Sequence, residues 1–242
     1  MLLPMAGLVV RAPWTRLPDI LGSEGVITAL RLSLATSAVT TAVCLVCGVP
    51  LAWLLARTTL PGRSLLRGLV TVPLVLPPVI GGVALLVAFG RRGLVGESLY
   101  DTFGVSLPFT TAGVVMAQSF VAMPFLIVAV DGALRTSDRR YEDMAATLGS
   151  SGWTTFRRVT LPSVAPGLLA GAVLCWARAL GEFGATITFA GSFPGTTRTL
   201  PLAAYASING GDIESAIVLS LLMIVTSVTV LVALRDRWVG SR

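Results

Sequence analysis

The stretch SDRRYEDMAATLGSSGWTTFRRVTLP, residues 137–162, is the longest charged interruption in an otherwise apolar sequence. Ser137 or Asp138 is placed to cap a helix, because either side-chain oxygen can accept a free amide hydrogen of a first helical turn. Apolar residues then recur at helical spacing as far as Leu148, which is typical of an amphipathic helix. Gly149 is expected to end this helix.

A second short helix is predicted after Gly152, because aromatic and aliphatic residues follow it three positions apart. Leu161 and Pro162 are expected to close this helix before the next apolar segment, since proline lacks an amide hydrogen and clashes with the preceding turn. Two short helices joined by glycine make a compact knob, which we define as residues 137–162. Four arginines rim the knob: Arg139, Arg140, Arg157 and Arg158. Such a knob between apolar spans indicates a docking element for a groove on another protein.

The composition is that of an integral membrane protein. Apolar residues make up 54% of the 242 residues, charged residues only 12%, and the mean hydropathy is +0.84, which exceeds what a soluble domain of this length carries. The net charge of +6 is compatible with nucleic-acid binding. However, the basic residues lie singly and in pairs between apolar runs, where membrane topology accounts for them. No nucleic-acid partner is therefore expected.

The absence of two residue types excludes several chemistries. The sequence has no histidine and no lysine, so all eighteen basic residues are arginine. A nucleotide-binding P-loop needs its lysine, and serine triads and zinc protease motifs need histidine, so the chain is not expected to be an enzyme. Cys44 and Cys47 form a C-x-x-C motif inside an apolar run, where helix packing is the expected role, and no metal site is predicted.

Five apolar runs reach the length of about 20 residues that a membrane-spanning helix needs. They are residues 28–56, 68–89, 110–130, 164–189 and 215–234. The predicted fold class is an all-α, polytopic helical bundle, with a membrane domain over residues 28–236 and a short tail at 237–242. Residues 1–27 are interpreted as an N-terminal stub and linker, because Met1–Val10 is apolar but only half a span long. An upstream extension of this stub would make a sixth span.

The arginines predict the orientation of these spans, because positively charged loops stay on the cytoplasmic side. Eleven arginines fall on one side of the predicted spans: Arg57, Arg63, Arg67, Arg135, Arg139, Arg140, Arg157, Arg158, Arg235, Arg237 and Arg242. The loops of the other side hold Arg91, Arg92 and Arg198, which nearby carboxylates partly balance. The knob and the C-terminus are therefore expected to face the cytoplasm.

Arg178 and Glu182 are four residues apart in the fourth predicted span and are expected to share one helix face. Ionisable groups at this depth are costly and usually face a bundle interior or a wet cavity. Two interpretations stay open: a mutually satisfied pair that fixes helix packing, or a pair that belongs to a pathway or its gate.

Glycines surround this pair. Gly181 and Gly184 flank Glu182, and Gly167 and Gly171 stand in G-x-x-x-G register. Small residues in this pattern let two backbones approach closely. This face is therefore expected to pack tightly against a neighbouring helix, either of this chain or of a second copy of it.

Prolines interrupt the second predicted span. Pro77 and Pro78 lie in its middle and are followed by Gly81 and Gly82, so regular helical hydrogen bonding must break there. Broken backbone at membrane depth is tolerated where it is buried in protein or lines water. The alternatives are a plain kink and a segment that lines a pathway.

The knob resembles the EAA loop of permease subunits of bacterial ATP-binding-cassette importers. Asp143-Met144-Ala145, then Gly149, then Leu161-Pro162 stand at the spacing of that family, with aspartate in place of its glutamate and Glu142 adjacent. The resemblance implies a type I importer fold in which the knob is a coupling helix seated in a groove of the ATPase subunit. The residues implied in this contact are Glu142, Asp143, Ala145, Ala146, Gly149, Leu161 and Pro162.

Three further stretches look like the molybdate branch of these permeases: residues 76–82, 89–96 and 177–186. Sulfate and tungstate permeases share the Gly-Glu-Phe-Gly-Ala core at 181–185, whereas Gly-Arg-Arg-Gly at 90–93 favours molybdate. The alternatives are therefore a sulfate, thiosulfate or tungstate permease. An ion-coupled secondary carrier is a further alternative, but such carriers usually show inverted repeats and intramembrane carboxylates. The sequence has no evident repeat, and only Glu182 lies deep.

The resemblance implies a homodimer of permease subunits in contact with lipid in the bacterial plasma (inner) membrane. It also implies two ATPase subunits on the cytoplasmic side, which bind ATP and Mg²⁺, and a molybdate-binding protein outside. No cofactor is implied in this chain, and the implied mechanism is alternating access. Hydroxyl groups and backbone amides at broken helix ends offer weak, reversible stabilisation of a tetrahedral dianion. The pathway or gate candidates are Arg178, Glu182, Gly181, Gly184, Thr186, Pro77 and Pro78.

Overall fold

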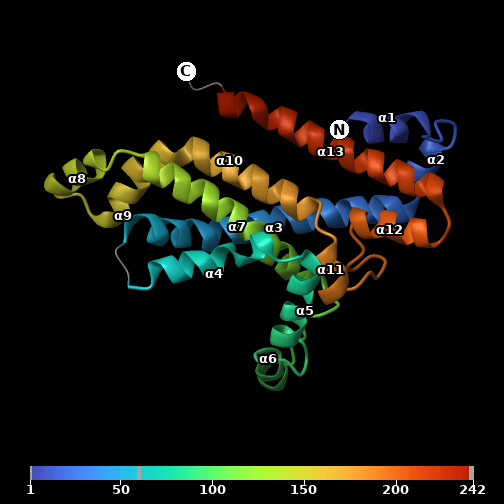
Figure 1. Cartoon of the computed structure of the whole chain (residues 1–242), viewed down its shortest axis with the longest axis horizontal. Helices are drawn as coiled ribbons and strands as arrows, with labels where there is room; N and C mark the ends of the chain where they lie inside the picture. Colours follow the sequence, from blue (N-terminus) through green and yellow to red (C-terminus); the bar gives the residue numbers. More distant parts are fainter. Residues whose placement is uncertain (1, 59–60, 240–242) are drawn as a thin grey trace.

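The computed structural model describes residues 2–58 and 61–239, and every regular element in that part of the chain is helical (Figure 1). In chain order these are α1 (Leu2–Val10), α2 (Leu17–Leu21), α3 (Glu24–Arg57), α4 (Arg63–Val75), α5 (Pro78–Phe89), α6 (Gly96–Phe103), α7 (Thr111–Thr136), α8 (Arg140–Thr147), α9 (Gly152–Thr155), the π-helix η1 (Phe156–Thr160), α10 (Leu161–Leu180), α11 (Gly184–Phe189), α12 (Leu200–Asn209) and α13 (Ile213–Val239). The predicted all-α class is confirmed. Of the predicted tail, residues 240–242 lie outside the described residues, as do the side chains of Arg235 and Arg237.

The long helices α3, α7 and α10 pack together and bury the largest cluster of apolar side chains (Figure 1). Gly167 and Gly171 of α10 face Ala133 and Ala129 of α7, and a Cβ added at Gly171 would lie 2.9 Å from the Cβ of Ala129. The G-x-x-x-G face therefore packs against α7 within this chain, and not against a second copy.

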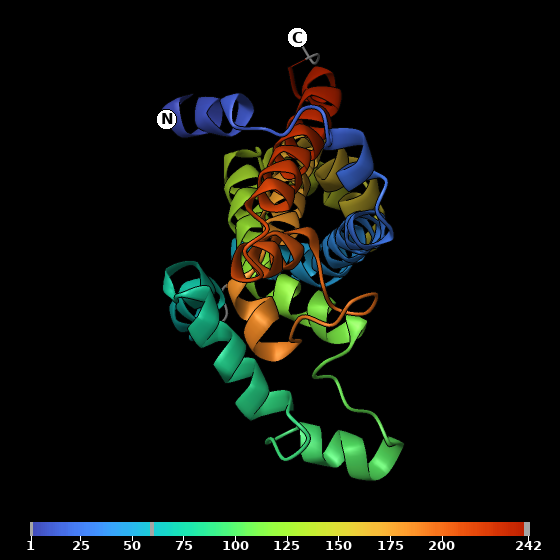
Figure 2. The same ribbon diagram turned by 90° about the vertical axis from the view of Figure 1, so that its right-hand side faces the viewer.

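In the part of the chain that the structure describes, four helices are long and apolar enough to cross a membrane. They are Glu24–Arg57, Thr111–Thr136, Gly152–Leu180 and Ile213–Ala233. The helices α4 and α5 meet this criterion only as a pair, bent by 119° at their junction. Counting this pair as one broken span gives the predicted five. The short helix α1 lies along α13 near the N-terminus (Figure 1, Figure 2).

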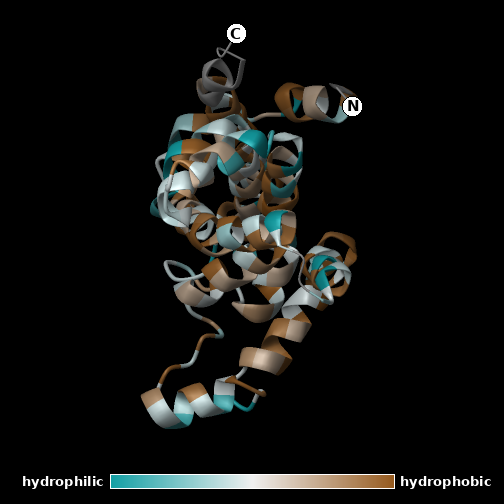
Figure 3. Cartoon of the chain, turned by 90° about the vertical axis from the view of Figure 1, so that its left-hand side faces the viewer, coloured by the Kyte–Doolittle hydropathy of each residue, from teal (hydrophilic) through white to brown (hydrophobic). Residues whose placement is uncertain are grey.

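The break between α4 and α5 follows from its two prolines. Leu76 is extended, with φ −67° and ψ 133°, as expected for a residue before proline. Pro77 precedes α5, and Pro78 is its first residue. The amide of a first helical residue has no acceptor within the helix, so proline costs no hydrogen bond there. The bend is far larger than a proline kink. It sends α5 out of the bundle as an arm that ends in α6, with apolar residues along most of α5 (Figure 2, Figure 3).

The predicted bounds of the fourth span, residues 164–189, differ from the observed helix at both ends. At its start, α9, η1 and α10 form one continuous helix from Gly152, so Leu161 and Pro162 do not close a helix. The π-helix η1 explains this, because its wider turn lets the chain continue into a residue that has no amide hydrogen. At the other end, α10 stops at Leu180, and α11 is a separate short helix that begins at Gly184.

Candidate functional site

The knob has the first predicted helix, and the second predicted helix is the start of the longer helix that continues into α10. The amide of Arg140 donates to the Oδ1 atom of Asp138 at 3.0 Å, which caps the start of α8. Gly149 follows the end of α8 with φ +81°, a left-handed conformation that glycine adopts without strain. The amide of Ser150 then donates to the carbonyl of Ala145 at 3.0 Å. The prediction that Gly149 ends this helix is confirmed.

The outer surface of the knob carries large exposed apolar side chains among its charged ones. Leu148 is 86% exposed and Trp153 is 71% exposed, and Tyr141 and Met144 are also well exposed. Within the described part of the chain, nothing covers these side chains. The knob therefore presents the kind of apolar, helical surface that inserts into a groove of another protein.

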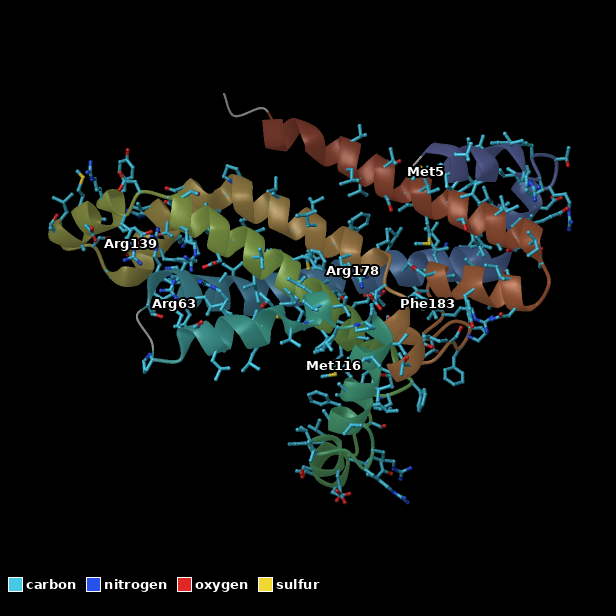
Figure 4. All side chains as sticks on the ribbon, viewed as in Figure 1. Met5, Arg63, Met116, Arg139, Arg178 and Phe183 are labelled. Carbon is cyan, nitrogen blue, oxygen red and sulfur yellow. The ribbon has the colours of Figure 1, made fainter. Side chains whose placement is uncertain are left out.

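The inner surface of the knob is fastened to the membrane bundle by charged groups. The Nη2 atom of Arg57, at the end of α3, lies 2.8 Å from the Oε1 atom of Glu142 in α8. Thr160 donates its hydroxyl hydrogen to the same carboxylate oxygen at 3.0 Å. The side chains of Arg57 and Glu142 are only 7% and 19% exposed. The guanidinium of Arg139 adds bonds to the last carbonyls of α3 (Figure 4).

The predicted coupling residues therefore differ in the direction that they face. Glu142 faces the bundle, whereas the neighbouring Asp143 is exposed. The other members occupy the same end of the molecule: Ala145 (half-buried), Ala146 (exposed), Gly149 (exposed), Leu161 (half-buried) and Pro162 (exposed). Sequence reasoning missed Arg57 as the partner of Glu142. The sequence shows that Arg57 ends a span and that the knob contains acidic residues, but it does not indicate which acidic residue pairs with Arg57.

A second candidate region is the junction, defined here as the break at residues 181–183 together with the helices α5 and α11 that meet beside it. The Nη2 atom of Arg178 lies 2.6 Å from the Oε2 atom of Glu182, which makes an ion pair without hydrogen-bond geometry. The amide of Ala185 donates to the Oε1 atom of Glu182 at 2.8 Å. Glu182 is 1% exposed. Its Oε1 atom accepts one hydrogen bond, whereas its Oε2 atom is held by the ion pair alone. The predicted pair is confirmed, although Glu182 lies just beyond the end of α10.

Glycines bring the two broken spans into contact. A Cβ added at Gly184 of α11 would lie 3.0 Å from the Cβ of Pro78 and 3.1 Å from the amide nitrogen of Val79. A Cβ added at Gly82 of α5 would lie 2.7 Å from the Cβ of Thr188 and 2.9 Å from the carbonyl oxygen of Ala185. Two groups of candidates from different parts of the sequence, around Pro78 and around Gly184, thus form one site.

Not all junction candidates line open space. Thr186 is fully buried in α11, and its hydroxyl has no hydrogen-bond partner among the described residues. Gly181 and Pro77 are exposed at the two breaks. The hydroxyl of Thr186 thus lies in a packed region.

A ladder of buried polar side chains between α3 and α7 was not anticipated. Thr40 donates its hydroxyl hydrogen to Gln118 Oε1 at 2.9 Å, and Gln118 Nε2 donates to the hydroxyl of Thr36 at 3.3 Å. Nearby, the amide of Leu200 donates to the hydroxyl of Ser33 at 2.7 Å, which joins α12 to α3. The sequence contained a pattern that indicates such a ladder, because the hydroxyl residues of α3 recur at helical spacing in an apolar run.

These features define a class: a polytopic membrane protein with a broken-helix core and a helical docking knob outside the bundle. The chain belongs to the family of binding-protein-dependent transport system inner membrane components, whose family model matches residues 48–241. The expected importer-permease fold is thereby confirmed.

Similarity to curated proteins covers nearly the whole chain. The molybdenum transport system permease protein ModB of Mycobacterium tuberculosis is 47% identical over 237 residues, which are 97% of this chain and 88% of that protein. ModB of Escherichia coli K12 is 46% identical over 78% of this chain and 83% of that protein. The sulfate transport system permease protein CysT of Escherichia coli K12 is 31% identical over 96% of this chain and 84% of that protein. The resemblance to the molybdate branch is confirmed.

Solved structures share the fold. A bacterial ABC transporter involved in the import of the acidic polysaccharide alginate matches with a TM-score of 0.79 at 17% identity, over 98% of this chain and 89% of that one. The bacterial alginate ABC transporter in complex with an alginate pentasaccharide-bound periplasmic protein matches with a TM-score of 0.78 at 16% identity, over 96% and 86% of the two chains.

Proposed function

We propose that this chain is the transmembrane subunit of an ATP-driven importer that moves molybdate across the cytoplasmic membrane by alternating access. The observation that carries the proposal is the difference in identity between the relatives named as molybdenum permeases and the relative named as a sulfate permease. Nucleotide and loaded binding protein would each favour one of two conformations of the bundle.

In this proposal a separate ATPase subunit docks on the exposed apolar surface of the knob. The inner fastening through Arg57, Glu142 and Thr160 supports this role, because a knob tied to the end of α3 transmits a push to the bundle rather than bending. ATP and Mg²⁺ would bind to the ATPase subunit, so this chain would be non-catalytic and would carry no cofactor. The knob and the C-terminus would face the cytoplasm.

A homodimer of permease subunits is the assembly that we propose. The arm formed by α5 and α6 supports it, because α5 contacts the bundle mainly through α11 and leaves an apolar face open. The exposed residues of that face include Val79, Ile80, Val83 and Val87. A second copy would cover this face and place the two junctions beside a common two-fold axis.

The junction would then act as the gate of the pathway. Glu182 neutralises Arg178, so the region does not present a bare cation that would trap a dianion. Arg198, at the opposite end of the bundle from the knob, is held by Ser192 through its Nε and Nη2 atoms. It would lie on the side where an extracytoplasmic molybdate-binding protein delivers the anion.

The experiment that tests the proposal is ATP-dependent uptake in proteoliposomes that contain this chain, its ATPase subunit and a loaded binding protein. Labelled molybdate is competed with tungstate and with sulfate. We expect uptake that tungstate blocks and that sulfate leaves unchanged. Strong competition by sulfate would move the chain to the sulfate and thiosulfate permeases. Uptake that persists without an ATPase subunit would overturn the importer assignment in favour of an ion-coupled carrier.

A further inference from the structure

An apolar groove lies where the knob returns to the bundle. Pro50 and Trp53 of α3 form one wall, and Gly152, Trp153 and Phe156 of the α9–η1 helix form the other. The cavity has a volume of about 330 Å³. The rings of Trp153 and Phe156 stack with their centroids 5.8 Å apart, and Trp53 remains partly exposed. The groove is thus a preformed aromatic slot that no described residue fills.

The depth of the groove places it within reach of lipid. Arg57 ends α3, and Pro50 lies about 10 Å before it along the helix axis at about 1.5 Å per residue. The groove therefore lies along the last turns of a helix that is long and apolar enough to cross a membrane. Tryptophan is enriched at this level of membrane proteins, where its ring meets both acyl chains and head groups.

Two exposed arginines directly follow the groove residue Phe156 in the sequence. Arg157 follows Trp153 by four residues on one continuous helix and therefore lies on the same face, and Arg158 is next to it. Both arginines are exposed, and neither has a carboxylate within 4 Å among the described residues. The nearest acidic residue of the knob's inner surface, Glu142, is already paired with Arg57.

We propose that this groove binds an anionic glycerophospholipid, with an acyl chain between the aromatic walls and the phosphate beside Arg157 and Arg158. Basic pockets beside membrane helices recognise anionic head groups in this way. The site would make the angle between α3 and the α9–η1 helix, and so the seating of the knob, sensitive to the lipid. The proposal rests only on the membrane insertion of α3, and it is independent of the anion that the protein transports.

The test uses the tryptophans of the groove as probes. The full-length chain, with Trp14, Trp176 and Trp238 replaced by phenylalanine, is reconstituted in bilayers that contain dibrominated phosphatidylglycerol or dibrominated phosphatidylcholine. Bromine quenches the fluorescence of a tryptophan that it contacts. We expect phosphatidylglycerol to be preferred by roughly fivefold for each arginine that it meets, and the Arg157→Gln/Arg158→Gln variant to lose this preference.

Two control variants separate the site from general charge effects. Arg157→Lys/Arg158→Lys keeps the positive charge and should keep most of the preference, whereas Arg140→Gln removes an exposed arginine of α8 and should keep all of it. Gly152→Leu, at a position where an added Cβ meets no atom within 4 Å, should fill the groove and weaken quenching by both lipids at least twofold.

Three outcomes would overturn the proposal. They are equal quenching by the two lipids in the starting protein, an unchanged preference in the double glutamine variant, and complete protection of the groove tryptophans from lipid when the ATPase subunit is added. The last outcome would assign the groove to a protein interface. Size-exclusion profiles and apparent Tm values establish that each variant is folded before it is compared.

Discussion

Arg57 and Glu142 form an ion pair of 2.8 Å between the end of α3 and the knob helix α8, although 85 residues separate them in the sequence. Thr160 completes the contact from η1 by donating to the same carboxylate oxygen. One carboxylate thus ties together the first long span, the knob helix and the helix that returns to the bundle. Together with the bonds from Arg139 to the last carbonyls of α3, this contact connects α8 to the bundle.

Replacing Glu142 by glutamine should leave the guanidinium of Arg57 without its counter-charge in a half-buried place. Removal of one partner of a fully buried pair lowers the free energy of unfolding by about 3–5 kcal/mol. Solvent access to this pair reduces the loss to about 1–3 kcal/mol. The apparent Tm of the purified protein should fall accordingly. Asp143→Asn is the matched control, because Asp143 is exposed. Equal losses in the two variants would contradict the inward role of Glu142.

Gly149→Ala should weaken the turn between α8 and α9, because a side chain at φ +81° costs about 1 kcal/mol. Relief of this strain would rotate the knob, so we expect uptake to fall while ATP hydrolysis by the assembled importer continues. Gly132→Ala in α7 is the control, since an added Cβ there meets no atom within 4 Å. If Gly149→Ala transports like the control, the turn does not set the geometry of coupling.

Gly82→Ala should separate α5 from α11. The added methyl group would meet Thr188 and the carbonyl of Ala185 at less than 3 Å, and overpacking of this kind costs about 1–3 kcal/mol. We expect a lower apparent Tm together with reduced uptake. Gly68→Ala in α4, where an added Cβ has open space, should change neither. A fully active Gly82→Ala protein would show that the junction tolerates separation.

The contacts of Glu182 favour the packing interpretation of its pair with Arg178. Glu182→Gln keeps an oxygen for the amide of Ala185 but loses the charge, whereas Glu182→Ala loses both, so the alanine variant should be less stable by about 1 kcal/mol. In a double-mutant cycle, Arg178→Gln combined with Glu182→Gln should recover stability and uptake relative to either single variant. Recovered stability without recovered uptake would instead assign the pair to the gate.

Asp212 predicts a dependence on pH at the start of α13. Hydrogen bonds from the hydroxyl and amide of Ser215, assisted by Arg16, hold the pKa of Asp212 below its ordinary value of 3.8. A lowered folded-state pKa means that the stabilisation is complete above the ordinary value and is lost as pH falls through the folded value. The apparent Tm of the wild type should exceed that of Asp212→Asn at pH 7, and the two should converge below about pH 3.8. A difference that is constant with pH would exclude this role.

Local patterns in the sequence predicted much of this protein. The run of apolar residues predicted the spans, and the glycine at 149 predicted the end of α8, because hydropathy and helix termination depend on neighbours within a few residues. The error at Leu161-Pro162 has the same origin. Proline usually ends a helix, and the π-helix η1 that carries the chain through this position depends on packing that a local pattern does not encode.

The sequence by itself determined the membrane class, the helix that ends at Gly149 and the family, since each rests on composition or on residues at short, regular spacing. Only the tertiary structure decided which faces meet. It turned Glu142 inward to Arg57 while leaving Asp143 exposed, and it brought Pro78 against Gly184. The physical reason is that a contact between distant segments depends on how whole helices cross and rotate, which is set by the packing of the entire bundle.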